Sequence, residues 1–326
     1  MHDTEMMMDP NKSKEVAGLR VGLIGLGLMG TPMAHKLSQS GAMLRVWNRN
    51  QSKASQLATE LDNVFVCKTP CDVSEGADVI ILMLTDAEAV DEVVFGAEGN
   101  SKGLTNNLRP GSLLIDMGTT SVLKTRAFAT KLKMSGSEWV DAPVSGGTTA
   151  AESGTLTIMV GGSNQAFKKA LPWLQILGER ITHVGDTGAG QIAKSANQMI
   201  VGLTIGAVAE AFTLADANGV KAAKIREALF GGFAHSRILE LHGERMIKGD
   251  FQARAKCSIQ RKDIKEAIEL ANASNCNLPS LETNLKLWDY MIEENMGDLD
   301  HSALLLAISR QKKKPLKQMK GLPIFS

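Results

Sequence analysis

Residues 19–30 read LRVGLIGLGLMG, and this stretch decides the fold. Its first half is a short apolar run of the kind that forms a buried strand. The run leads directly into three glycines spaced G-x-G-x-x-G, and a helical stretch follows from about residue 29 to 40. In this context the glycines allow a tight turn, close approach of the backbone to a pyrophosphate, and close packing of helix on strand. We therefore predict a dinucleotide-binding turn formed by Gly25, Gly27, Leu28, Met29 and Gly30.

Strand-like segments alternate with helical windows over the first half of the chain. Continuous apolar runs are typical of strands that are buried on both faces, and their alternation with helices indicates a parallel sheet covered on both sides. The fold class predicted is α/β, with an N-terminal Rossmann-type doubly wound sheet. The predicted strands are residues 19–25, 42–48, 77–84, 111–117, 137–144, 155–162 and 179–185, and the helical windows between them include 29–40, 86–94 and 122–134.

The second half has a different pattern. Residues 190–217 form a long window without proline, apolar on nearly all sides, which predicts a buried helix joining two domains. Further helices are predicted at about 222–230, 262–273, 280–294 and 300–311, with no strand after residue 185. The predicted domains are a disordered extension (1–18), a dinucleotide-binding domain (19–185), an all-helical substrate and dimerisation domain (186–311) and a basic tail (312–326).

The end of the second strand bears on the choice of dinucleotide. NAD-binding turns place an acidic residue about 20 residues after the glycines, where it binds the ribose 2′-hydroxyl. Here the chain reads Trp47-Asn48-Arg49-Asn50, with no acid. Arg49 can hold a 2′-phosphate by charge-assisted hydrogen bonds, and the two asparagines can add neutral ones. This pattern favours NADP, with NAD as the second choice; the alternative is an exposed polar turn.

Composition excludes several classes of protein. The chain has 326 residues, 44% hydrophobic and 22% charged, as in ordinary globular proteins. The net charge of +1 and an aromatic content of 4% argue against nucleic acid or an anionic membrane as partner. Four cysteines without a C-x-x-C pair indicate reduced thiols, and the start has no signal-peptide pattern, so a cytoplasmic protein without a membrane span is expected.

The basic charge is concentrated at the C-terminus. Six basic residues and no acid lie between residues 310 and 326, so removing them from the net charge of +1 leaves −5 for the rest. We interpret this segment as a solvated tail, with recruitment to an anionic partner as the alternative.

Three further segments carry candidate chemistry: Asp141-Ala142-Pro143-Val144-Ser145-Gly146-Gly147, then residues 188–198 (GAGQIAKSANQ), then Gln260-Arg261-Lys262-Asp263 opening a helix. Together with GLIGLGLMG at the first strand, they resemble the β-hydroxyacid dehydrogenase family over about residues 20–308. This group includes 3-hydroxyisobutyrate dehydrogenases, tartronate semialdehyde reductases and glyoxylate/succinic semialdehyde reductases. The resemblance implies an NAD(P)-dependent dehydrogenase or reductase acting on a small hydroxy acid. The long apolar helix predicts a homodimer or homotetramer, because one chain offers few other elements to cover it.

Lys194 is the predicted catalytic residue. Reduction of an aldehyde needs a proton donor near the new alkoxide, and a lysine among Ala, Ile and Gly is not placed like a surface residue. The resemblance makes it the general acid in reduction and the general base in oxidation. Asn197 lies on the same helix face, three residues on, and would hydrogen-bond the substrate.

The remaining site residues are predicted mainly from the resemblance. Ser145, Gly146 and Gly147 offer a hydroxyl and open backbone N–H groups for a substrate carboxylate. Lys262 would reach cofactor and substrate from the second domain, and Asp263 could pair with it. Gln198 and Ser236 are assigned to the substrate, while Leu84, Thr85 and Thr119, which follow sheet strands, are assigned to the cofactor.

Two branch signals conflict. K-x-x-N-Q at residues 194–198 and Asp300-His301-Ser302-Ala303-Leu304 are similar to the tartronate semialdehyde reductases, whereas WNRN is more like the NADPH-using glyoxylate reductases. The substrate class thus includes tartronate semialdehyde, glyoxylate, and succinic or methylmalonate semialdehyde. An imine reductase-type relative or a non-enzymatic cofactor-binding scaffold are the alternatives, and Lys194 argues against both. His235 and His301 are interpreted as structural or surface residues, and the spacing of ligand-type residues shows no three-ligand metal site.

Overall fold

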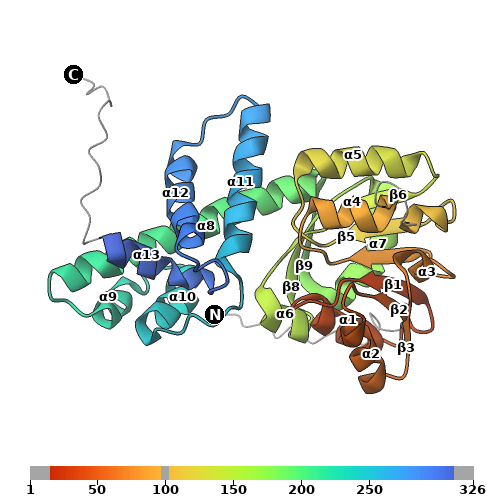
Figure 1. Ribbon diagram of the computed structural model, residues 1–326, viewed down its shortest axis with the longest axis horizontal. Helices are drawn as coiled ribbons and strands as arrows, with labels where there is room; N and C mark the ends of the chain where they lie inside the picture. The colour runs from red at the N-terminus through yellow and green to blue at the C-terminus, as the bar shows by residue number, and fades with distance from the viewer. Residues whose placement is uncertain (1–14, 97–102, 312–326) are drawn as a thin grey trace. The chain divides into compact units, whose positions relative to one another are not determined.

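The computed structural model describes residues 15–96 and 103–311, and it divides into two compact units, Met1–Lys194 and Ser195–Ser326 (Figure 1). The predicted extension over residues 1–14 and the basic tail over 312–326 lie outside the described residues. Residues 15–18 differ from the predicted disorder, because Val16 is fully buried in the core of the first unit.

The first unit contains one sheet. Its parallel part has the strand order β3-β2-β1-β4-β5-β6, which is the Rossmann order, and β1 and β4 flank the point where the order reverses. The strands are β1 (Arg20–Ile24), β2 (Met43–Trp47), β3 (Val64–Val66), β4 (Val79–Leu82), β5 (Leu113–Asp116), β6 (Glu138–Asp141), β7 (Val144–Ser145), β8 (Leu156–Gly161) and β9 (Gly178–Gly185).

The sheet departs from the predicted parallel arrangement beyond β6. β8 pairs antiparallel with β6 and β7, while β9 is parallel to β8. The segment predicted as one strand over 137–144 is divided into β6 and β7. The division falls at Ala142-Pro143, because proline has no N–H with which to continue a ladder.

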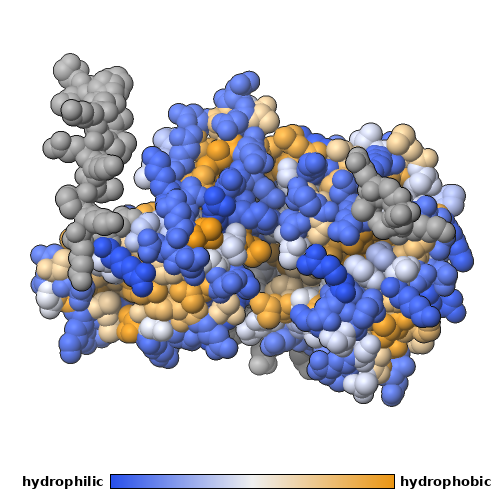
Figure 2. Space-filling view, viewed as in Figure 1, coloured by the Kyte–Doolittle hydropathy of each residue, from blue (hydrophilic) through white to orange (hydrophobic). Residues whose placement is uncertain are grey.

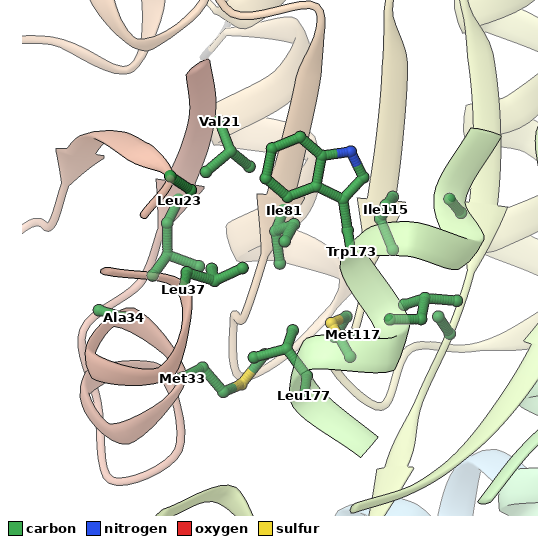
Figure 3. Close-up of a cluster of buried hydrophobic side chains, with 14 of the residues drawn as sticks. Val21, Leu23, Met33, Ala34, Leu37, Ile81, Ile115, Met117, Trp173 and Leu177 are labelled. Carbon is green, nitrogen blue, oxygen red and sulfur yellow. The ribbon is translucent and has the colours of Figure 1, made fainter. Parts of the chain in front are cut away.

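Helices cover both faces of this sheet (Figure 1). Successive residues of a strand point to opposite faces, so Ile81 packs on one side and Leu82 on the other. Helices α1 and α7 pack on the first face, whose core is drawn in Figure 3, and α4 and α5 pack on the second. The helices are α1 (Gly30–Gln39), α2 (Gln51–Glu60), α3 (Pro70–Val73), α4 (Ala87–Phe95), η1 (Leu104–Asn106), α5 (Val122–Lys133), α6 (Gly147–Ser153) and α7 (Asn164–Leu177).

The second unit is helical throughout its described residues. Its core surrounds Phe212, Trp288 and Leu304. Two boundaries differ from the predictions: α11 begins at Cys257, so Lys262 lies inside the helix rather than at its opening, and 300–311 is divided between η2 and α13. The helices are α8 (Ala189–Ala217), which begins in the first unit, then α9 (Ala222–Leu229), α10 (Arg237–Lys248), α11 (Cys257–Ala273), α12 (Pro279–Glu293), η2 (His301–Ala303) and α13 (Leu304–Gln311).

Helix α8 is unusually apolar. By length and composition alone it could cross a membrane, with a mean hydropathy of 1.5 over an 18-residue window. The sequence did not predict this, because the apolar residues of α8 do not form one uninterrupted run. However, Ile205, Ala209 and Phe212 of α8 lie in the core of the second unit. Core helices of globular proteins pass the same test, and we interpret α8 as such a helix.

Candidate active site

The glycine-rich turn follows β1 at the reversal point of the sheet. Gly25 has a φ of +98°, which side chains other than glycine rarely adopt, and a Cβ there would collide with the carbonyl oxygen of Met83. A Cβ on Gly30 would collide with the carbonyl oxygen of Gly25. By contrast, the space beside Gly27 is open to 4 Å. The turn is thus closely packed underneath and open at Gly27, which fits the approach of a pyrophosphate.

The loops after β4 and β5 lie side by side at the same edge. A Cβ on Gly118 would lie 2.6 Å from the carbonyl oxygen of Leu84, so glycine is required for the two loops to meet. Thr85 donates a hydrogen bond from Oγ1 to Asp86 Oδ2 (2.8 Å), and Asp86 caps α4. The structure therefore brings Leu84, Thr85 and the loop that carries Thr119 to the edge predicted for the cofactor.

The end of β2 is tied to the glycine-rich turn by Asn48. Its Oδ1 accepts a hydrogen bond from Leu26 N (2.9 Å), and its Nδ2 donates to the carbonyl of Asn50 (2.9 Å). Asn50 in turn caps α2. Both asparagines hold the local backbone, and Arg49 between them is exposed.

A hollow of about 310 Å³ lies beside this turn. Its lining includes Lys53, a second cation near Arg49 that was not among the predicted site residues. Lys53 could have been found from its position four residues after Arg49, in the first turn of a helix. The lining residues are Leu26, Gly27, Leu28, Thr31, Pro32, Lys53, Gln56, Leu57 and Glu60.

The start of α8 is held by the carboxylate of Asp141, at the end of β6. Gly188 N donates to Oδ1 (2.7 Å) and Gln191 N to Oδ2 (2.9 Å). Burial raises the pKa of Asp141, and these backbone hydrogen bonds oppose the rise by stabilising the ionised form. Gly190 allows the close approach, since a Cβ there would lie 2.6 Å from the carbonyl oxygen of Asp141.

Gln191 connects α8 to the loop after β5. Its Nε2 donates to the carbonyl of Gly118 (2.9 Å), and its Oε1 accepts from Thr120 N (3.2 Å). The same loop is fixed to its strand by Thr120, whose Oγ1 donates to Asp116 Oδ2 (2.9 Å). The loop after β5 and the first turn of α8 are therefore one hydrogen-bonded network.

Lys194 lies one turn further along α8 and is only 7% exposed. Its Nζ donates to the carbonyl oxygen of Val144 (2.9 Å), the residue that precedes Ser145. Gly146 and Gly147 follow with φ values of +133° and +69°, which glycine alone adopts readily. The structure thus brings the predicted acid/base lysine next to the predicted carboxylate-binding loop, within one compact unit.

In the second unit, α8 and α11 are joined by amide and carboxylate side chains. Asn197 Nδ2 donates to Gln198 Oε1 (2.8 Å), and Gln198 Nε2 donates to Asp263 Oδ2 (2.6 Å) and Gln260 Oε1 (3.2 Å). Gln198, predicted to bind substrate, is therefore engaged with α11. Lys262 forms ion pairs with Asp263 (3.0 Å) and Glu266 (3.3 Å).

Two family models match most of this chain. Residues 20–185 match the model of the NAD-binding domain of 6-phosphogluconate dehydrogenase, and residues 188–308 match that of the NAD-binding domain of NADP-dependent 3-hydroxyisobutyrate dehydrogenase. The chain is 41% identical to a 2-hydroxy-3-oxopropionate reductase of Escherichia coli K12, over 89% of this chain and 97% of the relative. The chain belongs to the β-hydroxyacid dehydrogenase family.

Two solved structures of 3-hydroxyisobutyrate dehydrogenases are similar to this chain. The 3-hydroxyisobutyrate dehydrogenase of Mycobacterium tuberculosis has a TM-score of 0.80 at 28% identity, covering 89% of this chain and 99% of that one. The enzyme of that name from Salmonella typhimurium has a TM-score of 0.79 at 26% identity, covering 88% and 99%. The family's activity is established for this chain at the level of an NAD(P)-dependent hydroxyacid dehydrogenase or semialdehyde reductase.

The structure also shows where Ser236, predicted to bind substrate, and the histidines of the second unit lie. Ser236 caps α10, accepting from Leu239 N (3.0 Å), and neighbouring His235 pairs with Glu240 (2.8 Å). The prediction that no three metal-ligand side chains come together was wrong, because the fold brings the ligand atoms of His242, Asp300 and His301 within 4.8 Å of one another. Asp300 and His301 are adjacent in the chain, but His242 is distant from both in sequence.

The geometry of these three residues nevertheless favours a hydrogen bond over a metal ion. The Nε2 atoms of His242 and His301 lie 2.6 Å apart, closer than two ligands of one tetrahedral ion. The carboxylate of Asp300 accepts hydrogen bonds from Ser302 and from the backbone N–H of Arg254 and Ala255. Burial alone would raise the pKa of Asp300, but these bonds and His301 hold it at about 2.

Proposed function

We propose that the protein is an NADPH-linked reductase that converts a small aldehyde or 2-oxo acid bearing a carboxylate to its hydroxy acid. The observation that carries the proposal is the 2.9 Å hydrogen bond from Lys194 Nζ to the carbonyl of Val144, which places an amine beside the Ser145–Gly147 loop. Among candidate substrates, 2-hydroxy-3-oxopropionate (tartronate semialdehyde) comes first because of the relative that is 41% identical. Glyoxylate and succinic and methylmalonate semialdehydes follow.

The mechanism assigns one task to each group. The hydroxyl of Ser145 and the N–H groups of Gly146 and Gly147 bind the substrate carboxylate. A bound nicotinamide supplies a hydride to the carbonyl carbon. Lys194, as an ammonium, donates a proton to the carbonyl oxygen, so that one hydride and one proton yield the alcohol. In oxidation the neutral amine of Lys194 accepts the hydroxyl proton.

The preference for NADPH rests on charge beside the turn. Arg49 and Lys53 supply two cations near the end of β2, and residues 47–50 offer no acid for a ribose 2′-hydroxyl. Both cations can hold a 2′-phosphate by charge-assisted hydrogen bonds.

The alternative functions have less support. Imine reductases share the fold, at 19% identity and a TM-score of 0.54 for the enzyme from Pseudomonas, but this likeness extends to the fold alone. A non-enzymatic scaffold would have no use for a buried lysine held at a substrate loop. We therefore prefer the NADPH-linked reductase to both alternatives.

We also propose a homodimer or homotetramer located in the cytoplasm. Helix α8 presents Ile200 and Leu214, each 67% exposed, on one face of the second unit. Figure 2 shows apolar side chains at the surface between hydrophilic ones. A second copy covering this face would bury them.

The first experiment measures steady-state oxidation of NADPH and NADH with glyoxylate and the three semialdehydes. We expect turnover with NADPH, and a loss of about a hundredfold or more in kcat for Lys194→Ala, since general acid catalysis contributes about 10²–10⁴. Lys133→Ala, which removes an exposed lysine from α5, is the matched control and should retain activity. Tight NADPH binding without turnover of any of these substrates would refute the proposed reductase activity. It would instead favour an imine reductase or a non-enzymatic scaffold.

A further inference from the structure

Lys262 lies between two carboxylates on α11. Its Nζ is 3.0 Å from Asp263 Oδ1 and 3.3 Å from Glu266 Oε2. The side chains of Lys262, Asp263 and Glu266 are 23%, 2% and 15% exposed, so water screens these charges only weakly. One cation is thus shared by two acids in a mostly buried position.

The two acids differ in how firmly they are held. Asp263 also accepts a hydrogen bond from Gln198 Nε2 (2.6 Å), which fixes it to α8 as well as to Lys262. Among the described residues, Glu266 has one hydrogen-bond partner, Lys262, one helical turn away. Asp263 is therefore held by two side chains, Gln198 and Lys262, whereas Glu266 is held, within the described part of the chain, by Lys262 alone.

The carboxylate of Glu266 conflicts with anion binding. With both acids ionised the three side chains carry a net charge of −1, which repels a phosphate or carboxylate that approaches Lys262; with Glu266 protonated the net charge is zero. We propose that Glu266 is the proton-linked partner of Lys262, so that binding of an anionic group of cofactor or substrate at Lys262 is accompanied by uptake of a proton on Glu266. This inference rests on the proposed function and on the prediction, implied by the family resemblance, that Lys262 contacts those ligands.

The surroundings of Glu266 fit a group that titrates near neutral pH. Burial raises the pKa of Glu266 to about 7; Lys262 opposes the rise, and Asp263 and Glu269 add to it. The side chain that reaches Asp263 from α8 is the uncharged Gln198, and Asp289 of α12 is paired with Arg261. An anion at Lys262 would raise the pKa of Glu266 further and draw a proton from solvent onto it, with no other bond changed.

Calorimetry on the full-length protein tests this proposal. NADPH is titrated at pH 7.5 in two buffers of different ionisation enthalpy, whose comparison counts the protons taken up. In a second arm, glycolate is titrated into the protein–NADPH complex. Uptake in the first arm assigns the anion to a cofactor phosphate, and uptake in the second assigns it to a substrate carboxylate.

We expect the wild type to take up a substantial fraction of one proton in one arm, and Glu266→Gln to lose that uptake. The wild-type Kd for that ligand should rise by up to about tenfold per pH unit above pH 7, the limit for one linked proton, relative to Glu266→Gln. Glu266→Asp keeps a titrating carboxylate and should retain part of the uptake. Glu293→Gln, which removes an exposed acid of α12, should behave as the wild type.

Two failures are distinguishable. Equal proton uptake in the wild type and Glu266→Gln, or none in either arm, would overturn the inference while leaving reductase activity intact. Absence of NADPH binding and turnover in the wild type would instead refute the proposed function. Circular dichroism of Glu266→Gln confirms that the variant is folded, and Glu266→Asp provides the same comparison if it is not.

Discussion

Asp141 shows how one side chain can fix the start of α8, the helix that carries the proposed catalytic lysine. Its carboxylate accepts two backbone N–H bonds at the start of α8, one turn before Lys194. In Asp141→Asn, the amide nitrogen would face one of these donors, leaving a buried N–H unpaired at a cost of about 1–3 kcal/mol. We expect kcat to fall about tenfold or more as Lys194 shifts, because small misplacements of catalytic groups are costly. Steady-state kinetics alongside thermal unfolding measure both effects.

The matched control is Ser163→Ala, which removes the cap of α7 in the same unit without touching α8. It should lower stability by about 1 kcal/mol and leave kcat unchanged. An unaltered kcat in Asp141→Asn would show that α8 needs no such anchor.

Site residues were predictable where their role is local. The glycine-rich turn can be identified because strand, turn and helix are consecutive in the chain. Lys194 could be singled out because a lysine in an apolar stretch is conspicuous. The roles of Asp141 and Gln191 could not be assigned, since their partners lie 47 to 73 residues away and no local pattern specifies them. Glu266 was missed because a glutamate one turn from a lysine is ordinary on an exposed helix.

Elements were predictable where periodicity is strong and no residue interrupts it. Helix α7, which was not predicted, contains Pro172, a residue that normally ends a helix. Helix α6 begins at the second of two glycines with positive φ, Gly146 and Gly147. Strand β3 has only three residues, too few for a pattern. Helix α10, which was also not predicted, contains Gly243, and glycine inside a helix weakens the helical pattern. In the fold, the missing side chain of Gly243 leaves room for Phe212.

The contact between α10 and η2 gives the second unit an acid-sensitive point. Burial, followed by the neighbouring His301, lowers the pKa of His242 to about 3 from its usual 6.5. The unfolded chain therefore binds more protons than the folded one between pH 6.5 and 3. Stability from this residue is complete above pH 6.5 and is lost as the pH falls towards 3. We expect the free energy of unfolding of the second unit to fall by about 1 kcal/mol per pH unit, since one pKa unit equals about 1.4 kcal/mol.

Hydrogen exchange in urea, followed by mass spectrometry at pH 7, 6 and 5, resolves the peptides of the second unit. His242→Gln, which can still donate to His301, should flatten the pH dependence. His35→Gln, on the surface of the first unit, should retain the wild-type slope. A slope that His242→Gln leaves unchanged would assign acid sensitivity elsewhere.

The proposed assembly of two or more copies rests on the face of α8 that one chain leaves uncovered. Only 39% of the most apolar window of α8 is buried within the chain, although its inward face completes the core of the second unit. Burying one aliphatic side chain such as Ile200 or Leu214 is worth about 1.5–3 kcal/mol, so a second copy that covers both gains appreciably. We therefore expect light scattering to give at least twice the mass of one chain for the wild type. Ile200→Glu should shift the protein towards monomer, whereas Lys286→Ala, an exposed change on α12, should not. If the wild type is a monomer without detergent, neither a partner chain nor a membrane covers this face. Ile200 and Leu214 would then be isolated exposed aliphatic residues, which monomeric proteins tolerate.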